Sequence, residues 1–213
     1  MSCFYPLKAH KSIVDNQIYF DESKLSGLGY PLFLSCGRCL GCRIDYSRSW
    51  SVRCVHEASL YSDNCFITLT YDNDHLPEDG SLDVRHFQLF MKRLRDKFGS
   101  GIRFFHCGEY GEQFSRPHYH ALLFNFDFPD KVFWRKTSSG RLFTSPSLSS
   151  LWCKGYSVIA PLTFKSAAYV ARYSLKKVSG ARSHSSSSSY KAFQDHYQGK
   201  KPEYATMSRR PGS

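Results

Sequence analysis

The stretch from Arg116 to Phe124 constrains the fold more than any other part of the chain. It reads Arg-Pro-His-Tyr-His-Ala-Leu-Leu-Phe, so an apolar run follows two histidines in alternate positions. Alternate side chains of a β-strand point to the same face, so His118 and His120 would project together while Tyr119 points to the opposite face. Two imidazoles on one strand can hold a divalent cation. The stretch therefore predicts a strand with two metal ligands, the alternative being two polar residues on a half-exposed strand.

The neighbouring segments predict an α+β domain. Asn64–Asp72 and Ile102–Glu109 are rich in β-branched and aromatic residues, which is typical of strands. Between them, Asp83 is the expected N-cap of a helix with apolar residues at helical spacing, which ends at Gly99. A further helix with a basic outer face is predicted from Ile44 to Tyr61.

The remaining segments give weaker signals. Residues 1–35 are expected to be irregular apart from a short strand near Ile18–Phe20, and residues 127–155 to be loops. Tyr156–Leu162 predicts a short strand, in which Pro161 indicates a sheet edge or a strand end.

A third metal ligand follows from the register of two strands. If Ile102–Glu109 and the His-x-His strand form a hairpin, Glu109 lies opposite His118 with Cβ atoms about 5 Å apart. A shift of one residue would turn Glu109 away, and Glu112 would then be the alternative ligand. In the predicted register His106 faces the other side of the sheet as a packed core histidine.

A second group of reactive side chains is predicted on a helix from Phe164 to Lys177, capped by Thr163. Its apolar stripe can pack on the sheet. Beside it runs a polar stripe at positions i, i+3, i+4 and i+7, namely Tyr169, Arg172, Tyr173 and Lys176. Two phenols one turn apart beside two cations are typical of a reactive face, whereas helical tyrosines are otherwise usually core or rim residues.

Three cysteines at three-residue spacing stand among glycines: Cys36, Cys39 and Cys42. Thiolates at this spacing can fold around one cation, with Cys3 or Cys54 as the fourth ligand. A structural Zn²⁺ site is one hypothesis, and buried free thiols are the other.

The charge of the chain indicates a polyanionic partner. Lys and Arg number 29 against 18 Asp and Glu, which gives a formal net charge of +11, and 16% of the residues are aromatic. This combination favours nucleic acid over a bilayer. The candidate DNA contacts are Arg116, Trp134, Lys165 and Lys177. Since no segment has the roughly 18 apolar residues of a membrane span and no leader is evident, the chain is predicted to be cytosolic, with no membrane partner.

Three motifs, in this order along the chain, resemble those of the HUH endonucleases that start rolling-circle DNA replication. They are Phe66–Tyr71, Gly108–Gly111 with Pro117–His120, and Tyr169–Lys177. Three further segments look more narrowly like the replication initiators of gokushovirus-type microviruses, which are small single-stranded DNA phages: Cys36–Cys42, Arg53–Ala58 and Met207–Pro211. One departure is Arg172, where relatives often have lysine between the tyrosines.

The resemblance implies an α+β fold with a central antiparallel sheet of about five strands and flanking helices, an HUH/RRM-like palm preceded by a Cys-containing N-terminal segment. It implies that Glu109, His118 and His120 hold Mn²⁺ or Mg²⁺. Tyr169 and Tyr173 would then attack single-stranded DNA at a phage origin and form a 5′-phosphotyrosyl link.

Elementary chemistry agrees with those roles. Tyrosine is a poor nucleophile at its ordinary pKa of about 10, so Arg172 and Lys176 are expected to favour the phenolate. The site of action would be the host cell cytoplasm. Docking of a host helicase and polymerase, and the oligomeric state, are left open.

The predicted organisation has three parts. Residues 1–62 form the N-terminal Cys-containing segment and basic helix, residues 63–180 the endonuclease core, and residues 181–213 a mobile Ser-rich loop and tail. Because such initiators usually continue further, the chain is expected to be truncated.

Two other functions compete with this interpretation. A zinc hydrolase built on His-x-His needs further acidic or histidine ligands soon after the pair, and Leu122–Phe126 supplies none. A non-enzymatic single-strand-binding protein with a zinc knuckle explains the charge, aromatics and cysteines, but leaves the tyrosine stripe without a role.

Overall fold

The computed structural model describes residues 3–24, 27–111, 114–138, 140–176 and 199–208, with the backbone alone for 173–176. The chain divides into two compact units, Met1–Tyr46 and Ser47–Ser213. Helix α1 (Leu40–Ser59) contributes residues to both units and begins four residues before the predicted Ile44. The predicted boundaries at residues 62 and 180 stay predictions.

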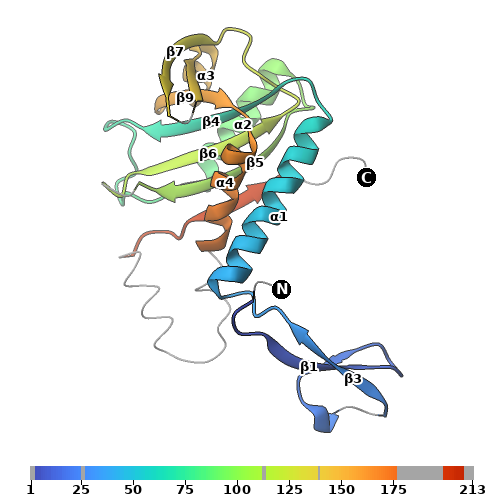
Figure 1. The fold of residues 1–213 in the computed structure, drawn as a ribbon. Helices are drawn as coiled ribbons and strands as arrows, with labels where there is room; N and C mark the ends of the chain where they lie inside the picture. The colour runs from blue at the N-terminus through green and yellow to red at the C-terminus, as the bar shows by residue number, and fades with distance from the viewer. Residues whose placement is uncertain (1–2, 25–26, 112–113, 139, 177–198, 209–213) are drawn as a thin grey trace. The chain divides into compact units, whose positions relative to one another are not determined.

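The first unit contains a three-stranded antiparallel sheet in the order β2-β1-β3 (Figure 1). Its strands are β1 (Leu7–Ser12), β2 (Ile18–Tyr19) and β3 (Gly29–Leu34), with a short 3₁₀ helix at Glu22–Lys24. The prediction that residues 1–35 are largely irregular was therefore wrong. The sheet buries only Ala9 and Ser12 of β1, so the sequence lacks the alternation that usually marks a strand.

The second unit contains a seven-stranded antiparallel sheet in the order β10-β5-β6-β4-β9-β8-β7. Its elements are β4 (Asn64–Tyr71), α2 (Val84–Phe98), β5 (Arg103–Tyr110), β6 (Pro117–Phe124), β7 (Val132–Thr137), β8 (Gly140–Thr144), α3 (Pro146–Trp152), β9 (Gly155–Pro161), α4 (Phe164–Lys176) and β10 (Tyr204–Met207). The predicted α+β class is confirmed, with seven strands in this sheet instead of about five.

Helices cover both faces of this sheet (Figure 1). On one face, α2 and α3 pack on alternate residues of β6, namely Tyr119, Ala121 and Leu123. On the other face, Cys54 of α1 and three residues of α4 pack on Leu122 and Phe124. The sequence folds this way because β6 is apolar on both faces along its second half, as expected for a central strand with covered faces.

Two predictions in the second unit were wrong. Residues 127–155 were expected to be loops, yet they contain the β7–β8 hairpin and α3. Five of the six β7 residues are exposed, so no alternating apolar pattern could reveal the strand. Strand β9 is not at an edge, because it pairs with both β4 and β8. The alternative reading of Pro161 as a strand end is confirmed.

The helix caps follow the predicted chemistry. The Asp83 carboxylate accepts a hydrogen bond from the Arg85 N–H at 2.8 Å, and Gly99 ends α2 with a φ of 110°. At α4, the Thr163 hydroxyl accepts from the Ser166 N–H at 3.2 Å, and the Ser166 hydroxyl accepts from the Thr163 N–H at 2.8 Å. Among the described residues, no helix combines the length and apolar character needed to cross a membrane.

Candidate functional site

The β5–β6 hairpin brings together the three residues predicted to be metal ligands. Glu109 of β5 lies directly opposite His118 of β6, so the predicted register is confirmed. His120 projects from the same face two residues further along β6. One ligand atom from each of these three residues lies within 4.8 Å of the other two, which makes the group large enough to hold one cation.

The opposite face of β6 fixes the strand in place. Tyr119 is fully buried, and its hydroxyl donates a hydrogen bond to the Asp83 carbonyl at 2.8 Å and accepts one from the Asp83 N–H at 2.9 Å. The Tyr71 hydroxyl is 2.7 Å from the same oxygen. This network anchors the strand to the N-terminus of α2, so both histidines are carried by a rigid element.

A single carboxylate oxygen is the focus of the site. Oε1 of Glu109 accepts hydrogen bonds from His118 Nε2 at 2.7 Å and from His120 Nε2 at 2.9 Å. The second oxygen, Oε2, is buried and has no hydrogen-bond partner among the described residues. A buried carboxylate oxygen without a donor has its lone pairs free for a cation.

The outer nitrogens of the two imidazoles also have partners. His118 Nδ1 donates to the Arg116 carbonyl at 3.0 Å, and His120 Nδ1 is 2.9 Å from the Thr68 hydroxyl. Such bonds fix the ring orientation and leave Nε2 as the inward-facing atom, as in many metal-binding histidines. His118 has acceptors at both nitrogens, so it is held as an imidazolium as long as a proton occupies Nε2.

The three pKa values follow from burial and from these contacts. Burial raises the pKa of Glu109, but the hydrogen bonds from His118 and His120 outweigh it and hold the pKa at about 2. Burial lowers the pKa of His118, yet the hydrogen bonds to Glu109 and the Arg116 carbonyl leave it raised overall. The pKa of His120 is lowered, because burial outweighs its hydrogen bond to Glu109. His120 is the more deeply buried of the two rings, with 9% of its side chain exposed against 15% for His118, which accounts for the opposite directions.

Helix α4 supplies a phenol to the same oxygen. Its buried residues Ala167, Val170 and Ala171 pack on the sheet, and this packing turns Tyr169 toward the hairpin. The Tyr169 hydroxyl donates a hydrogen bond to Glu109 Oε1 at 2.8 Å. Its ring lies edge-on to His120 with centroids 4.9 Å apart. The structure therefore brings Tyr169 into direct contact with two of the three metal-ligand candidates.

The other predicted residues of this helix are only partly described. Arg172 is exposed, and Lys165 is exposed near the start of α4. Tyr173 and Lys176 belong to α4, but their side chains lie outside the described residues. Lys177 and the alternative ligand Glu112 also lie outside them.

Two predicted DNA contacts are placed elsewhere. The Arg116 guanidinium donates to the Tyr71 carbonyl at 2.9 Å and to Asn73 Oδ1 at 2.6 Å, so it ties the β5–β6 connection to the end of β4. Trp134 is on β7, the edge strand four positions from β6, and the Arg135 guanidinium lies 4.2 Å from its ring centroid.

The cysteines form a separate group. Cys36, Cys39 and Cys42 meet Cys3, which resolves the choice of a fourth neighbour. Cys54 instead lies in the apolar cluster between α1, α4 and the sheet, where burial raises the pKa of its thiol to about 12.

Sequence reasoning missed Thr68 as a member of the site. Thr68 lies directly opposite His120 in the β4–β6 ladder, so its hydroxyl reaches the imidazole. The signal was present in the Phe66–Tyr71 motif. Recognising it required the pairing of β4 with β6, which sequence spacing does not provide.

Known proteins resemble the chain along most of its length. The family model of the replication-associated protein ORF2 matches residues 64–178. The chain is 35% identical over 190 residues to the replication-associated protein VP4 of Bdellovibrio phage phiMH2K, covering 84% of this chain and 59% of that protein. It is 32% identical over 197 residues to the replication-associated protein ORF2 of Spiroplasma virus 4, covering 84% and 62%. It is 36% identical over 153 residues to the replication-associated protein ORF4 of Chlamydia phage 1, covering 68% and 38%.

The chain spans about three fifths of the length of the first two relatives. No solved structure matches it significantly. The matched family region contains the whole β5–β6 hairpin and Tyr169. The resemblance to phage replication initiators of the microvirus type, predicted from three motifs, is thereby confirmed, and the chain belongs to the ORF2 family of replication-associated proteins.

Proposed function

We propose that this protein nicks single-stranded DNA at a phage replication origin by attack of a tyrosine hydroxyl, and rejoins DNA ends in rolling-circle replication. The observation that carries the proposal is the 2.8 Å hydrogen bond from the Tyr169 hydroxyl to Glu109 Oε1. It puts a nucleophile of the required type against a carboxylate that two imidazoles also contact. Membership in a family of replication-associated proteins supports the same function.

Glu109, His118 and His120 are the residues that would hold a divalent cation. The fit rests on the partnerless Oε2 of Glu109 and on the two Nε2 atoms that face it. A set of two imidazoles and one carboxylate admits Mg²⁺ or Mn²⁺, and the nitrogen ligands favour Mn²⁺. When bound, such a cation neutralises charge that develops on the non-bridging phosphate oxygens during cleavage.

The covalent step has a simple balance. The Tyr169 oxygen attacks the scissile phosphorus, a P–O bond to tyrosine forms, and the bond from phosphorus to the 3′ oxygen breaks. The phenol loses its proton, and the departing 3′ oxygen gains one. Because Glu109 is an anion with a pKa of about 2, its role is to orient the hydroxyl, and it is a weak base for that proton. Arg172 and Lys176 are proposed to favour the phenolate.

A tyrosine nucleophile explains rejoining, which hydrolysis by water cannot. The 5′-phosphotyrosyl link keeps the energy of the broken phosphodiester, so a free 3′-hydroxyl can reverse the step. Two tyrosines permit a second cleavage while the first link persists. Tyr173 follows Tyr169 by about one helical turn on α4, and we propose that the two act in turn.

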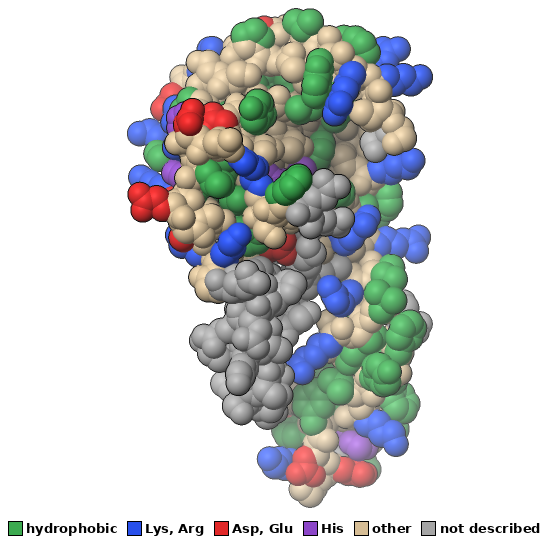
Figure 2. Space-filling view, turned by 90° about the vertical axis from the view of Figure 1, so that its left-hand side faces the viewer, with side chains coloured by type: hydrophobic (Ala, Val, Ile, Leu, Met, Phe, Trp, Pro, Cys, Tyr) green, Lys and Arg blue, Asp and Glu red, His purple; other side chains and the backbone are tan. Residues whose placement is uncertain are grey.

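The substrate is proposed from charge. The formal net charge of +11 favours a polyanion, and Figure 2 shows Lys and Arg side chains spread over the face it draws. Lys165, exposed on the helix that carries Tyr169, is the best-placed candidate phosphate contact among the described residues. Lys177 and Trp134 remain proposed contacts. Since the Arg116 guanidinium is hydrogen-bonded within the protein, we propose that it acts by holding the β5–β6 connection.

The test uses single-stranded oligonucleotides tiled over the phage genome that encodes the chain, incubated with the protein and Mn²⁺ and resolved on a denaturing gel. A covalent protein–DNA adduct is the expected result. Cleavage without an adduct would indicate a hydrolase, and binding without cleavage a non-enzymatic single-strand-binding protein. Either of these results would overturn the proposal.

A double variant sharpens the test. Tyr169→Phe combined with Tyr173→Phe should form no adduct, and a double variant that still formed one would refute tyrosine attack. The matched control is Tyr156→Phe, because Tyr156 is a 70%-exposed tyrosine on β9 outside the site. This control should form adduct at the wild-type level.

A further inference from the structure

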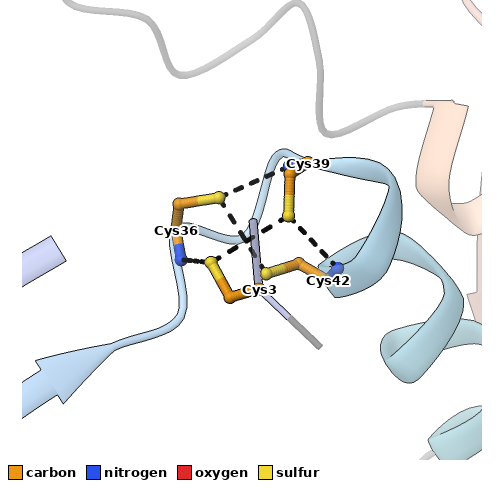
Figure 3. A group of neighbouring side chains, drawn as sticks. All are labelled: Cys3, Cys36, Cys39 and Cys42. Atoms are coloured by element: carbon orange, nitrogen blue, oxygen red, sulfur yellow. Dashed lines mark hydrogen bonds between the residues drawn. The ribbon is translucent and has the colours of Figure 1, made fainter. Parts of the chain in front are cut away.

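The four cysteines of the first unit surround one small space (Figure 3). Their sulfur atoms all lie within 4.8 Å of one another. The sulfurs of Cys36 and Cys42 are 3.9 Å apart, as are those of Cys39 and Cys3. A disulfide would require about 2.05 Å. Four thiolates bound to Zn²⁺ at about 2.3 Å form a tetrahedron with edges of about 3.8 Å, which agrees with the observed spacing.

The backbone around the sulfurs is arranged to hold thiolates. Cys3 Sγ accepts a hydrogen bond from the Cys36 N–H at 3.3 Å, and Cys36 Sγ accepts one from the Cys39 N–H at 3.4 Å. Cys39 Sγ accepts bonds from the N–H groups of Phe4 at 3.3 Å and Cys42 at 3.5 Å. Such bonds orient the ligands and stabilise their negative charge.

A glycine makes the turn between two ligands feasible. Gly37 follows Cys36 with a φ of 72°, in the left-handed region that glycine adopts without strain. The turn lets the chain double back so that Cys36 and Cys39 face the same point. Cys42 then enters from the first turn of α1, three residues further on.

The first unit lacks the apolar core that would otherwise hold it together. Among its described residues, the buried hydrophobic side chains are those of Ala9 and Cys42. Large apolar residues such as Ile13, Val14 and Leu28 are exposed. Units of this size usually depend on disulfides or a metal for stability. The four sulfurs join the start of the chain, the end of β3 and the start of α1, which are the places a staple would have to connect.

We propose that Cys3, Cys36, Cys39 and Cys42 bind one structural Zn²⁺ ion, and that this ion is required for the fold of the N-terminal sheet β1–β3. Four protein ligands leave no open position, so the ion has no catalytic role. The site is chemically distinct from Glu109, His118 and His120, because thiolates select Zn²⁺ while the mixed imidazole and carboxylate set suits Mn²⁺ or Mg²⁺.

The first test measures metal in the full chain by elemental mass spectrometry and needs no DNA, so its result is independent of the nicking proposal. About one zinc per chain is expected. Iron or no bound metal would overturn the assignment. Replacing zinc with Co²⁺ should give the visible absorption of a tetrahedral cobalt tetrathiolate.

Two cysteine variants test the ligand set. Cys3→Ala should bind zinc at least about tenfold more weakly, whereas Cys54→Ala should retain one zinc per chain. Cys153→Ala, which removes an exposed thiol outside the group, is the surface control. Zinc affinity at the wild-type value in Cys3→Ala would overturn the proposed ligand set.

The folding role is tested by hydrogen exchange with and without a zinc chelator. Chelation should remove amide protection from β1 and β3 and leave β4–β6 protected. Unchanged protection of β1 and β3 in zinc-free protein would show that the ion is not required for the fold of this sheet.

Discussion

The Tyr169 hydroxyl and Oε1 of Glu109 are 2.8 Å apart, which links helix α4 to the β5–β6 hairpin through a single carboxylate oxygen. The same oxygen is contacted by His118 and His120. Nucleophile and metal-ligand candidates therefore share one atom. A change at Tyr169 should affect chemistry without displacing the imidazoles, because each ring has its own bond to Glu109 and a second partner at Nδ1.

Tyr169→Phe removes the attacking oxygen but keeps the ring that packs against His120 and Phe66. We expect adduct yield to fall at least about tenfold, with the remaining adduct entirely on the peptide that contains Tyr173. Peptide mapping of the nuclease-digested adduct measures both quantities. An unchanged yield, with no adduct mapped to Tyr169 in the wild type, would contradict the assignment.

Glu109→Gln replaces the carboxylate with a neutral amide of the same shape. Mn²⁺ affinity should fall at least about 100-fold in calorimetric titration, because the amide offers a weaker ligand and no charge. In metal-free protein the pKa of His118 should also fall, since the hydrogen bond to Glu109 is a main cause that raises it. Histidine NMR titration measures that shift.

The control for this change is Glu57→Gln. Glu57 is a partly buried carboxylate that pairs with Arg103 at 2.9 Å, away from the imidazoles. Mn²⁺ affinity should stay at the wild-type value in this variant. Equal losses in the two variants would show that the effect of Glu109→Gln comes from general electrostatics.

Thr68→Val tests the positioning of His120. The change keeps the branched shape of the side chain and removes the oxygen 2.9 Å from His120 Nδ1. Loss of such an outer partner typically weakens metal binding by about 10 to 100-fold. The control is Thr70→Val on the same face of β4, opposite His118, where the structure gives the hydroxyl no hydrogen bond to a described residue. Equal Mn²⁺ affinity in both variants and the wild type would refute a positioning role for Thr68.

The metal-ligand hairpin could be predicted because its signals are local. Apolar alternation, a short connection and the period of two residues determine which side chains of β5 and β6 share a face, so Glu109, His118 and His120 followed from spacing alone. Thr68 and Tyr169 could not be placed in this way. Their positions depend on the pairing of β4 with β6 and on the docking of α4, which are contacts between residues about 50 to 60 positions apart.

The N-terminal sheet and the β7–β8 hairpin failed for the opposite reason. Both expose most of their side chains, so burial imposes no alternating pattern on the sequence. The choice of Cys3 over Cys54 was likewise undetermined, because both spacings allow a ligand. It depends on Cys54 packing against residues of β5, β6 and α4 while the chain start folds onto β3.

His106 should make the stability of the protein depend on pH. It is 1% exposed and stacked on Phe87, with ring centroids 3.6 Å apart, which confirms the predicted core position. Burial lowers its pKa to about 3 from an ordinary value of 6.5. Between these two values the unfolded chain binds a proton that the folded protein excludes, so this group favours folding above pH 6.5 and progressively less as the pH falls. His106→Gln should remove about 2 kcal/mol of the decrease in unfolding free energy between pH 7 and pH 5. Urea denaturation of both proteins at the two pH values measures the difference, and parallel pH profiles would show that His106 is protonated in the folded state.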